Sequence, residues 1–252
     1  MKVNEALDII TNSLVQDKLV QAIYVKGSVG RGEQDEYSDL DLYCLVDDQD
    51  LSAFLQRRIS HLESYGKMIF HDDIFIIAPQ IIAVYENMLH VDLFTVTEET
   101  FVEKDFFKVI YDPHNRLEKF KASQSLRLSA AEFQDAVDDI AWFLFQYKKS
   151  SDRGNDLWSV TMLNHMMAHL AKVLLHKYQP ERAQLGIKTV ETSLPEDVVK
   201  AISHIQENIT PKQHQNAIVF IRRLLDSELE WILDEVLNPE KIKTLLHLIL
   251  ED

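Results

Sequence analysis

The chain has 252 residues, of which 46% are hydrophobic, and its formal net charge is −15. This length and apolar fraction suit one large globular domain or two modest ones, and no apolar run is long enough for a membrane-spanning helix. An acidic chain repels nucleic-acid phosphate, so action on a nucleic acid is not expected. Excess acid suits metal ions and cationic small molecules, although solubility alone would also explain it.

The acidic charge is concentrated in the first half of the chain. Residues 1–120 carry 11 basic and 22 acidic residues, a net charge of −11, and residues 121–252 carry −4. The segment MKVNEALDIITNSL contains no signal-peptide core, and the only cysteine, Cys44, lies in an apolar run typical of a buried strand. Nothing here indicates an oxidising compartment, and we expect a cytoplasmic protein.

In chain order, the first half alternates helical and strand patterns. Apolar residues at helical spacing predict a helix over 4–18, and a strand follows that ends at Gly27-Ser28. An acidic loop leads into a second strand, and residues 51–64 are predicted to be helical, with a stop at Gly66. Further strands are predicted at 74–78, 81–86, 89–96 and 108–112.

The second half contains only helical patterns. Long helices are predicted at 130–149, 156–178, 196–208, 211–237 and 239–250. We therefore predict an α+β protein with two domains. A head with a mixed sheet flanked by helices spans residues 1–120, and an all-helical bundle spans residues 121–252.

Three aspartates interrupt apolar strand patterns in the head. Asp39 and Asp41 are two residues apart, so a strand directs both side chains to one face. Asp92 stands alone in the apolar run LHVDLFTV. Neighbouring carboxylates repel each other unless a cation lies between them, and carboxylate oxygens are the ligands of Mg²⁺. The pattern predicts a site for two Mg²⁺ ions at these residues, of the kind that assists phosphoryl or nucleotidyl transfer.

A glycine-rich turn precedes the first two aspartates. Gly27 and Ser28 follow a strand, and Gly30 and Gly32 come soon after. Glycines let a backbone approach a ligand closely, and successive free N–H groups bind anions. Taken alone, the turn would equally suit a flexible hairpin loop.

Together these residues resemble a known family. Gly27-Ser28, ten further residues, Asp39-Leu40-Asp41 and a later Asp92 resemble the nucleotidyltransferase superfamily that includes DNA polymerase β. Within it, the chain looks most like the bacterial lincosamide and aminoglycoside nucleotidyltransferases. Residues 139–178 resemble the paired helices of their C-terminal, substrate-binding domain.

The resemblance implies a role for each matching residue. Gly27 and Ser28 would hold the triphosphate of ATP or another NTP, and Asp39 and Asp41 would bind the metal ions that bridge its phosphates. Asp92 would bind the second metal or act as the general base that takes the acceptor hydroxyl's proton.

The resemblance also assigns further nucleotide-binding cations. Arg31 could reach the phosphates, and Lys148, Lys149 and Arg153 would lie near the nucleotide tail. The three helical-domain cations equally suit a solvated helix end, where positive charge is favourable. A carboxylate of the helical domain, Asp138 or Asp139, is an alternative general base.

These observations predict an enzyme that moves a nucleoside monophosphate, most simply AMP from ATP, onto a hydroxyl of a neutral or cationic small molecule such as an antibiotic. A protein-modifying enzyme of the toxin–antitoxin type and a non-catalytic nucleotide-binding regulator are the alternatives. A homodimer is common among the enzymes that the chain resembles. The nucleobase and the acceptor stay open.

Overall fold

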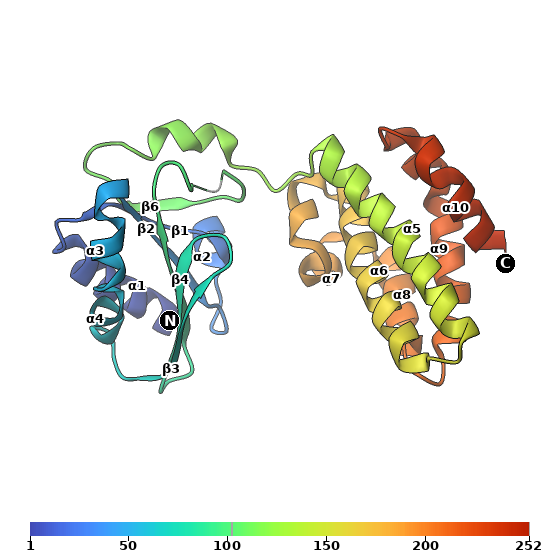
Figure 1. Cartoon of the computed structure of the whole chain (residues 1–252), viewed down its shortest axis with the longest axis horizontal. Coiled ribbons are helices and arrows are strands. Elements are labelled where there is room, and N and C mark those ends of the chain that lie inside the picture. Colours follow the sequence, from blue (N-terminus) through green and yellow to red (C-terminus); the bar gives the residue numbers. More distant parts are fainter. Residues whose placement is uncertain (102, 252) are drawn as a thin grey trace. The chain divides into compact units, whose positions relative to one another are not determined.

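The computed structural model describes residues 1–101 and 103–251, which form two compact units, Met1–Ser125 and Leu126–Asp252 (Figure 1). The boundary predicted from the sequence is 120/121. We call the first the head and the second the helical unit, and each is described by itself.

A six-stranded mixed sheet forms the centre of the head. Its strand order is β3-β4-β5-β2-β1-β6, with β2 and β5 parallel and the other neighbouring strands antiparallel. The strands are β1 (Val20–Val25), β2 (Leu40–Val46), β3 (Met68–Phe75), β4 (Pro79–Tyr85), β5 (His90–Val96) and β6 (Lys108–Tyr111). The predicted α+β class is confirmed.

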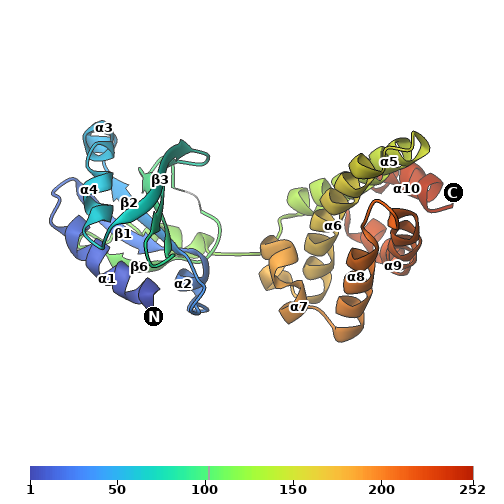
Figure 2. The same cartoon turned by 90° about the horizontal axis from the view of Figure 1, so that it is seen from below.

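The two faces of this sheet are covered differently. One face packs against α1 (Lys2–Val15), α3 (Leu51–Leu55) and α4 (Arg58–Glu63), and Figures 1 and 2 show these helices on one side of the sheet. The side chain of Cys44 is fully buried in this layer. The opposite face carries a smaller cluster around Tyr24, with Leu45, Phe101, Phe107 and Phe120 among its members. We call it the acid face, because Asp41 and Asp92 lie on it.

Two predicted elements of the head differ from the structure. The helix expected over 51–64 is broken into α3 and α4, and a 3₁₀ turn (Asp48–Asp50) precedes it. The strand expected at 74–78 is wrong: β3 begins at Met68, and Ile76, Ile77 and Ala78 lie between β3 and β4. Pairing with β4 extends a strand through polar His71-Asp72-Asp73, which a search for apolar runs overlooks.

The helical unit has a core of its own. Ser129 and Glu132 form a reciprocal capping box that fixes the first turn of α5. Leu144, Leu163, Leu170 and Ile221 are fully buried in the core of the unit. Its elements are α5 (Ala130–Asp152), α6 (Asp156–Tyr178), the 3₁₀ segment Pro180–Thr189, α7 (Val190–Ser193), α8 (Glu196–Asn208), α9 (His214–Glu235) and α10 (Pro239–Glu251). Among the described residues, none of the helices combines the length and hydropathy that a membrane crossing requires.

Candidate active site

The parallel register of β2 and β5 brings two of the predicted aspartates side by side. Asp41 and Asp92 are direct cross-strand partners, so their side chains share the acid face at the beginning of both strands. Asp39 precedes β2 and its side chain is 50% exposed, whereas that of Asp92 is 13% exposed. Residues about fifty positions apart in sequence therefore form one acidic group, because the two strands start level with each other.

A histidine that the sequence analysis did not identify lies within this group. The Nε2 atom of His90 is 3.0 Å from Oδ1 of Asp92, and its Nδ1 atom is 3.8 Å from Oδ2 of Asp39. The hydrogen bond with Asp92 raises the pKa of His90, and burial opposes that shift. A protonated His90 places positive charge between two carboxylates. His90 precedes Asp92 by two residues, so strand alternation was a signal that could have revealed it.

Asp41 is the most strongly perturbed carboxylate of the group. Burial, followed by the negative charges of Asp39 and Asp92, raises its pKa to about 6. Both causes disfavour the ionised form. Such a group gains most from a bound cation, because the cation would offset both the lost hydration and the repulsion.

The glycine turn lies directly against Asp41. Gly27 has φ +61°, and a Cβ atom on it would lie 2.1 Å from Oδ2 of Asp41. The backbone N–H of Lys26 donates to the Asp41 carbonyl at 3.1 Å, which fixes the turn to β2. Only glycine fits this position, for reasons of both backbone conformation and space. The turn continues as the short helix α2 (Gly27–Arg31).

Ser28 has a buried hydroxyl that the head leaves unpaired. Its Oγ atom is shielded from solvent and has no hydrogen-bond partner among the described residues. Buried hydroxyls are normally hydrogen-bonded, so an unpaired one next to a glycine turn indicates a group that receives a ligand.

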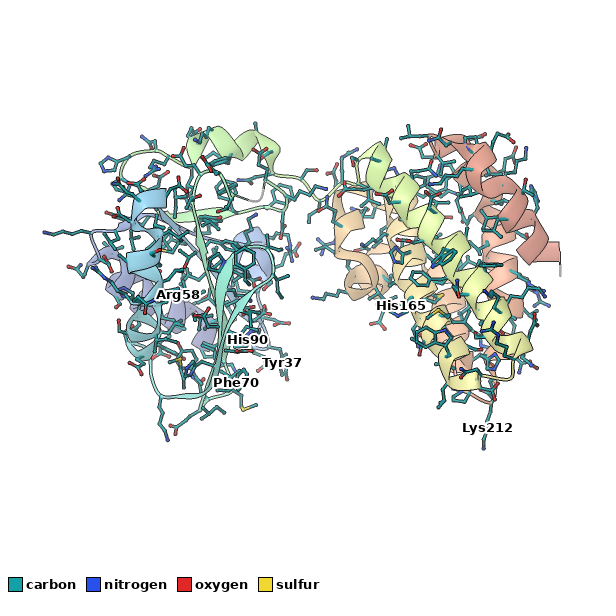
Figure 3. All side chains as sticks on the ribbon, in the orientation of Figure 1. Tyr37, Arg58, Phe70, His90, His165 and Lys212 are labelled. Atoms are coloured by element: carbon teal, nitrogen blue, oxygen red, sulfur yellow. The ribbon has the colours of Figure 1, made fainter. Side chains whose placement is uncertain are left out.

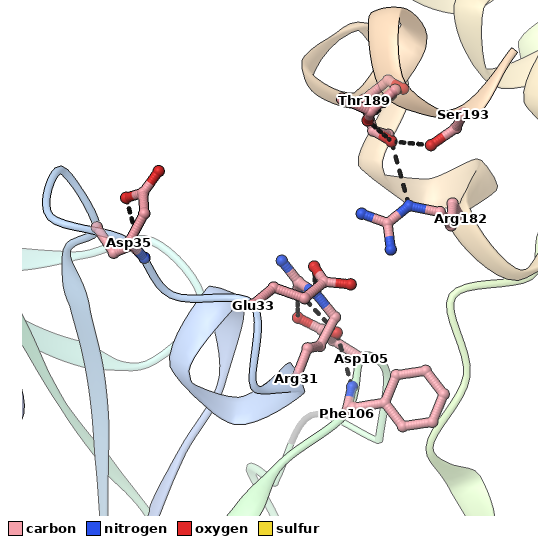
Figure 4. A network of polar contacts seen from close by, with 10 residues as sticks. Arg31, Glu33, Asp35, Asp105, Phe106, Arg182, Thr189 and Ser193 are labelled. Atoms are coloured by element: carbon pink, nitrogen blue, oxygen red, sulfur yellow. Dashed lines mark hydrogen bonds and ion pairs between the residues drawn. The ribbon is translucent and has the colours of Figure 1, made fainter.

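Two basic residues flank the turn, and both contact the segment before β6. The Nζ atom of Lys26 donates to the Lys104 carbonyl at 2.7 Å, and burial lowers the pKa of Lys26 to about 8 against the opposing charge of Asp105. Nη1 of Arg31 contacts both carboxylate oxygens of Asp105, at 3.0 and 3.2 Å, and its Nε donates to Glu33 (Figure 4). Arg31 is therefore neutralised by two carboxylates, and its contact with phosphate stays a prediction.

The predicted cations of the helical unit lie at the end of α5. Lys148 is 3.9 Å from Asp152, one helical turn away, and the Nζ atom of Lys149 is 5.3 Å from the centre of the Phe145 ring. Arg153 is exposed and forms the C-terminal cap of the helix. These contacts suit a solvated helix end, and a role in nucleotide binding stays a prediction.

The alternative general bases also have partners within the helical unit. Asp138 accepts a hydrogen bond from Gln134 at 2.9 Å and forms an ion pair with Lys241. The Oδ2 atom of Asp139 is 3.4 Å from Nδ1 of His169.

The carboxylate group of the head suits a divalent metal ion. In the described part of the chain, no three His, Cys, Asp or Glu side chains already form an arrangement that could hold a metal. The donors are nevertheless of the right kind, because Asp39, Asp41 and Asp92 lie where the parallel strands β2 and β5 begin and supply the oxygen ligands that Mg²⁺ prefers. The raised pKa of Asp41, caused by burial and then by its two acidic neighbours, makes a bound cation favourable at this carboxylate.

Comparison with known proteins finds a family that the head resembles. Residues 7–126 match the model of the nucleotidyltransferase domain family. None of the curated proteins that were compared matches the chain.

Solved structures with similarity to the chain include an aminoglycoside 6-adenyltransferase from Bacillus subtilis. It is 14% identical, with 97% of this chain and 98% of that chain covered and a TM-score of 0.39. A nucleotidyltransferase-like protein from Exiguobacterium sibiricum 255-15 is 15% identical, with 89% and 74% covered and a TM-score of 0.40. Neither TM-score is high enough for these structures to indicate the substrate of this chain.

The family match covers the strands that carry the glycine turn and all three aspartates. Residues 7–126 are therefore similar to a nucleotidyltransferase domain, and this similarity supports nucleotidyl transfer as the activity of the head.

Proposed function

We propose that this enzyme transfers AMP from ATP to a hydroxyl of a neutral or cationic small molecule, an antibiotic of the aminoglycoside or lincosamide type. The observation that carries the proposal is the pairing of Asp41 with Asp92 directly against Gly27 and the unpaired Ser28 hydroxyl. This arrangement unites a carboxylate group with a turn that suits phosphate. The net charge of −11 over residues 1–120 favours a neutral or cationic acceptor.

In the proposed reaction, the acceptor oxygen forms a bond to the α-phosphorus of ATP. The bond between the α-phosphorus and the β-bridging oxygen breaks, and pyrophosphate leaves with that electron pair. Asp92 takes the proton of the acceptor hydroxyl, and its hydrogen bond with His90 holds the carboxylate in place. Gly27 and Ser28 hold the triphosphate and orient the α-phosphorus for this attack.

Asp39, Asp41 and Asp92 would hold Mg²⁺ in this scheme. The bound metal would neutralise phosphate charge and stabilise the attacking and leaving oxygens. The chain's own contribution is to keep three carboxylates together where β2 and β5 begin, and the burial of Asp41 makes it a favourable partner for a cation.

The proposal is tested by incubating the protein with Mg²⁺, each of the four NTPs and a panel of aminoglycosides and lincosamides. We expect pyrophosphate release with ATP and a product heavier by one AMP, and no product from the Asp92→Asn variant. Exposed Asp48 provides a matched control, since Asp48→Asn should leave the rate unchanged. Modification of protein hydroxyls alone, or nucleotide binding without pyrophosphate release, would replace this proposal with one of the two alternatives.

The unpaired hydroxyl of Ser28 leads to a separate prediction. In Ser28→Ala, the free energy of ATP binding should become less favourable by about 1.5–3 kcal/mol, the contribution of a hydrogen bond to a charged group. The melting temperature of the ligand-free protein should not fall, because Oγ has no hydrogen bond to lose with any residue that the structure describes. Calorimetric titration and thermal unfolding measure the two effects. A lower melting temperature with unchanged ATP affinity would mean that Ser28 is structural.

A further inference from the structure

The β3–β4 hairpin exposes an unusual number of large apolar side chains. Solvent reaches more than half of the surface of each of Ile69, Phe70, Phe75, Ile76 and Ile77. Apolar groups gathered on the surface of a soluble protein commonly mark a binding surface.

The strand register divides these residues between the two faces of the sheet. Asp73 pairs across the sheet with Ile81, which is buried under the helices, and it forms an ion pair with the buried Arg58 of α4 at 2.8 Å. Phe75, two residues along, faces the same side. Phe70 and Ile74 alternate with them and therefore lie on the acid face.

On the acid face, Phe70 lies in a cross-strand row that contains a site residue, and Ile74 lies in the row of Phe94. Phe70 pairs with Val84, which pairs with His90, and Figure 3 labels Phe70 and His90 in the head. In the next row, Asp72 pairs with Ile82, which pairs with Asp92. We call Phe70, Ile74, Ile82 and Val84 the β3–β4 strip. Neighbouring strands are about 4.8 Å apart, so the strip extends about 10 Å from the carboxylates, the length of a drug-sized molecule.

The strip lies outside the packed core of the described head. Its four residues belong to neither of the two hydrophobic clusters that pack the faces of the sheet, and the side chain of Phe70 is 53% exposed. Asp72 lies in the middle of the strip, is exposed, and forms no hydrogen bond or ion pair with any described residue. The surface thus combines apolar area with one negative charge, in continuity with Asp92.

We propose that the β3–β4 strip binds the acceptor, and that the acceptor is an amphipathic amino alcohol rather than a uniformly polar sugar. Its apolar arm would lie on Phe70, Ile82 and Val84, its ammonium group would face Asp72, and its hydroxyl would reach Asp92. The inference rests on the proposed function and narrows its substrate class from aminoglycosides and lincosamides to the lincosamide type, which carries both an apolar arm and a basic amine.

The chain offers a matched pair of variants for the test. Phe70→Ser removes a ring from the strip, and Phe75→Ser removes the same ring from the same strand on the opposite face, where it is 74% exposed. Lincomycin is the probe, and its binding is measured by titration calorimetry together with the KM values for lincomycin and ATP. We expect Phe70→Ser to weaken lincomycin binding about tenfold, the effect of lost apolar contact, and to leave the KM for ATP unchanged. Phe75→Ser should match the wild type in both measurements.

A second variant tests the charge of the strip. Asp72→Asn should weaken lincomycin binding severalfold at low salt and have a smaller effect at 1 M salt, because screening already removes the attraction there. Thermal unfolding of every variant confirms that folding is intact.

The outcomes separate this inference from the proposed function. Lincomycin binding that is absent in the wild type, or equal in Phe70→Ser and Phe75→Ser, overturns the assignment of the strip even if another acceptor is modified. Better transfer to kanamycin than to lincomycin overturns the substrate class. A wild-type dimer that Phe70→Ser dissociates, with lincomycin affinity unchanged, assigns the strip to a second copy. Absence of pyrophosphate release with every acceptor refutes the proposed function instead.

Discussion

Replacement of Asp41 by asparagine should abolish nucleotidyl transfer and at the same time stabilise the ligand-free protein at neutral pH. The first effect is expected because burial and two neighbouring carboxylates destabilise the ionised form of Asp41, so this residue gains most from binding a metal ion. The second follows from its pKa, which burial and then Asp39 and Asp92 raise from 3.8 to about 6. Above pH 6 Asp41 is ionised in the folded protein, where its charge is less favourable than in the unfolded chain. This difference lowers the free energy of unfolding by about 3 kcal/mol.

The stabilisation expected in Asp41→Asn depends on pH, because the pKa of Asp41 is higher in the folded than in the unfolded protein. Below pH 3.8 the carboxyl group is protonated in both states, so the cost disappears there and grows as the pH rises towards the folded pKa of about 6. The Asp41→Asn variant should therefore melt at a higher temperature than the wild type at pH 7.5 and at the same temperature near pH 4. Mg²⁺ should raise the melting temperature of the wild type only. Full activity in the variant would exclude Asp41 from the reaction.

The second large effect is expected at Gly27. Gly27→Ala should eliminate transfer and nucleotide binding, because the new Cβ atom would lie 2.1 Å from Oδ2 of Asp41 and must displace either the turn or the carboxylate. The positive φ adds strain of about 1–2 kcal/mol. Nucleotide titration and thermal unfolding would measure the loss.

Gly32 provides the matched control for this substitution. Its φ is +74°, and a Cβ atom there would meet nothing within 4 Å. Gly32→Ala therefore carries the backbone strain without the steric conflict and should retain most of the activity. If both variants lose activity equally, backbone conformation rather than contact with Asp41 explains the glycine at position 27.

Short-range patterns alone single out the three aspartates, and their role in the reaction stays a prediction. Asp39 and Asp41 share a face because side chains alternate along a strand, and Asp92 was conspicuous in an apolar run. Which strands become neighbours is a property of the whole sheet. The direct pairing of Asp41 with Asp92 therefore emerged only from the parallel register of β2 and β5.

Contacts between distant segments explain what the sequence did not reveal. In the sequence, Lys26 is an ordinary polar residue after a strand. In the fold its ammonium group donates to the Lys104 carbonyl, 78 positions away. Likewise, the pairing of Arg31 with Asp105 joins segments 74 positions apart. No local pattern encodes either contact, because both depend on how the segment before β6 folds back onto the glycine turn.

The burial of Cys44 gives the protein an intrinsic reporter of its own unfolding. It is the only cysteine, its side chain is fully buried in β2, and burial raises the pKa of its thiol. Alkylating reagents attack the thiolate, so they can react only in molecules whose sheet has opened. The rate of alkylation in native buffer thus measures the opening free energy of the head alone, with no engineered label and without a signal from the helical unit.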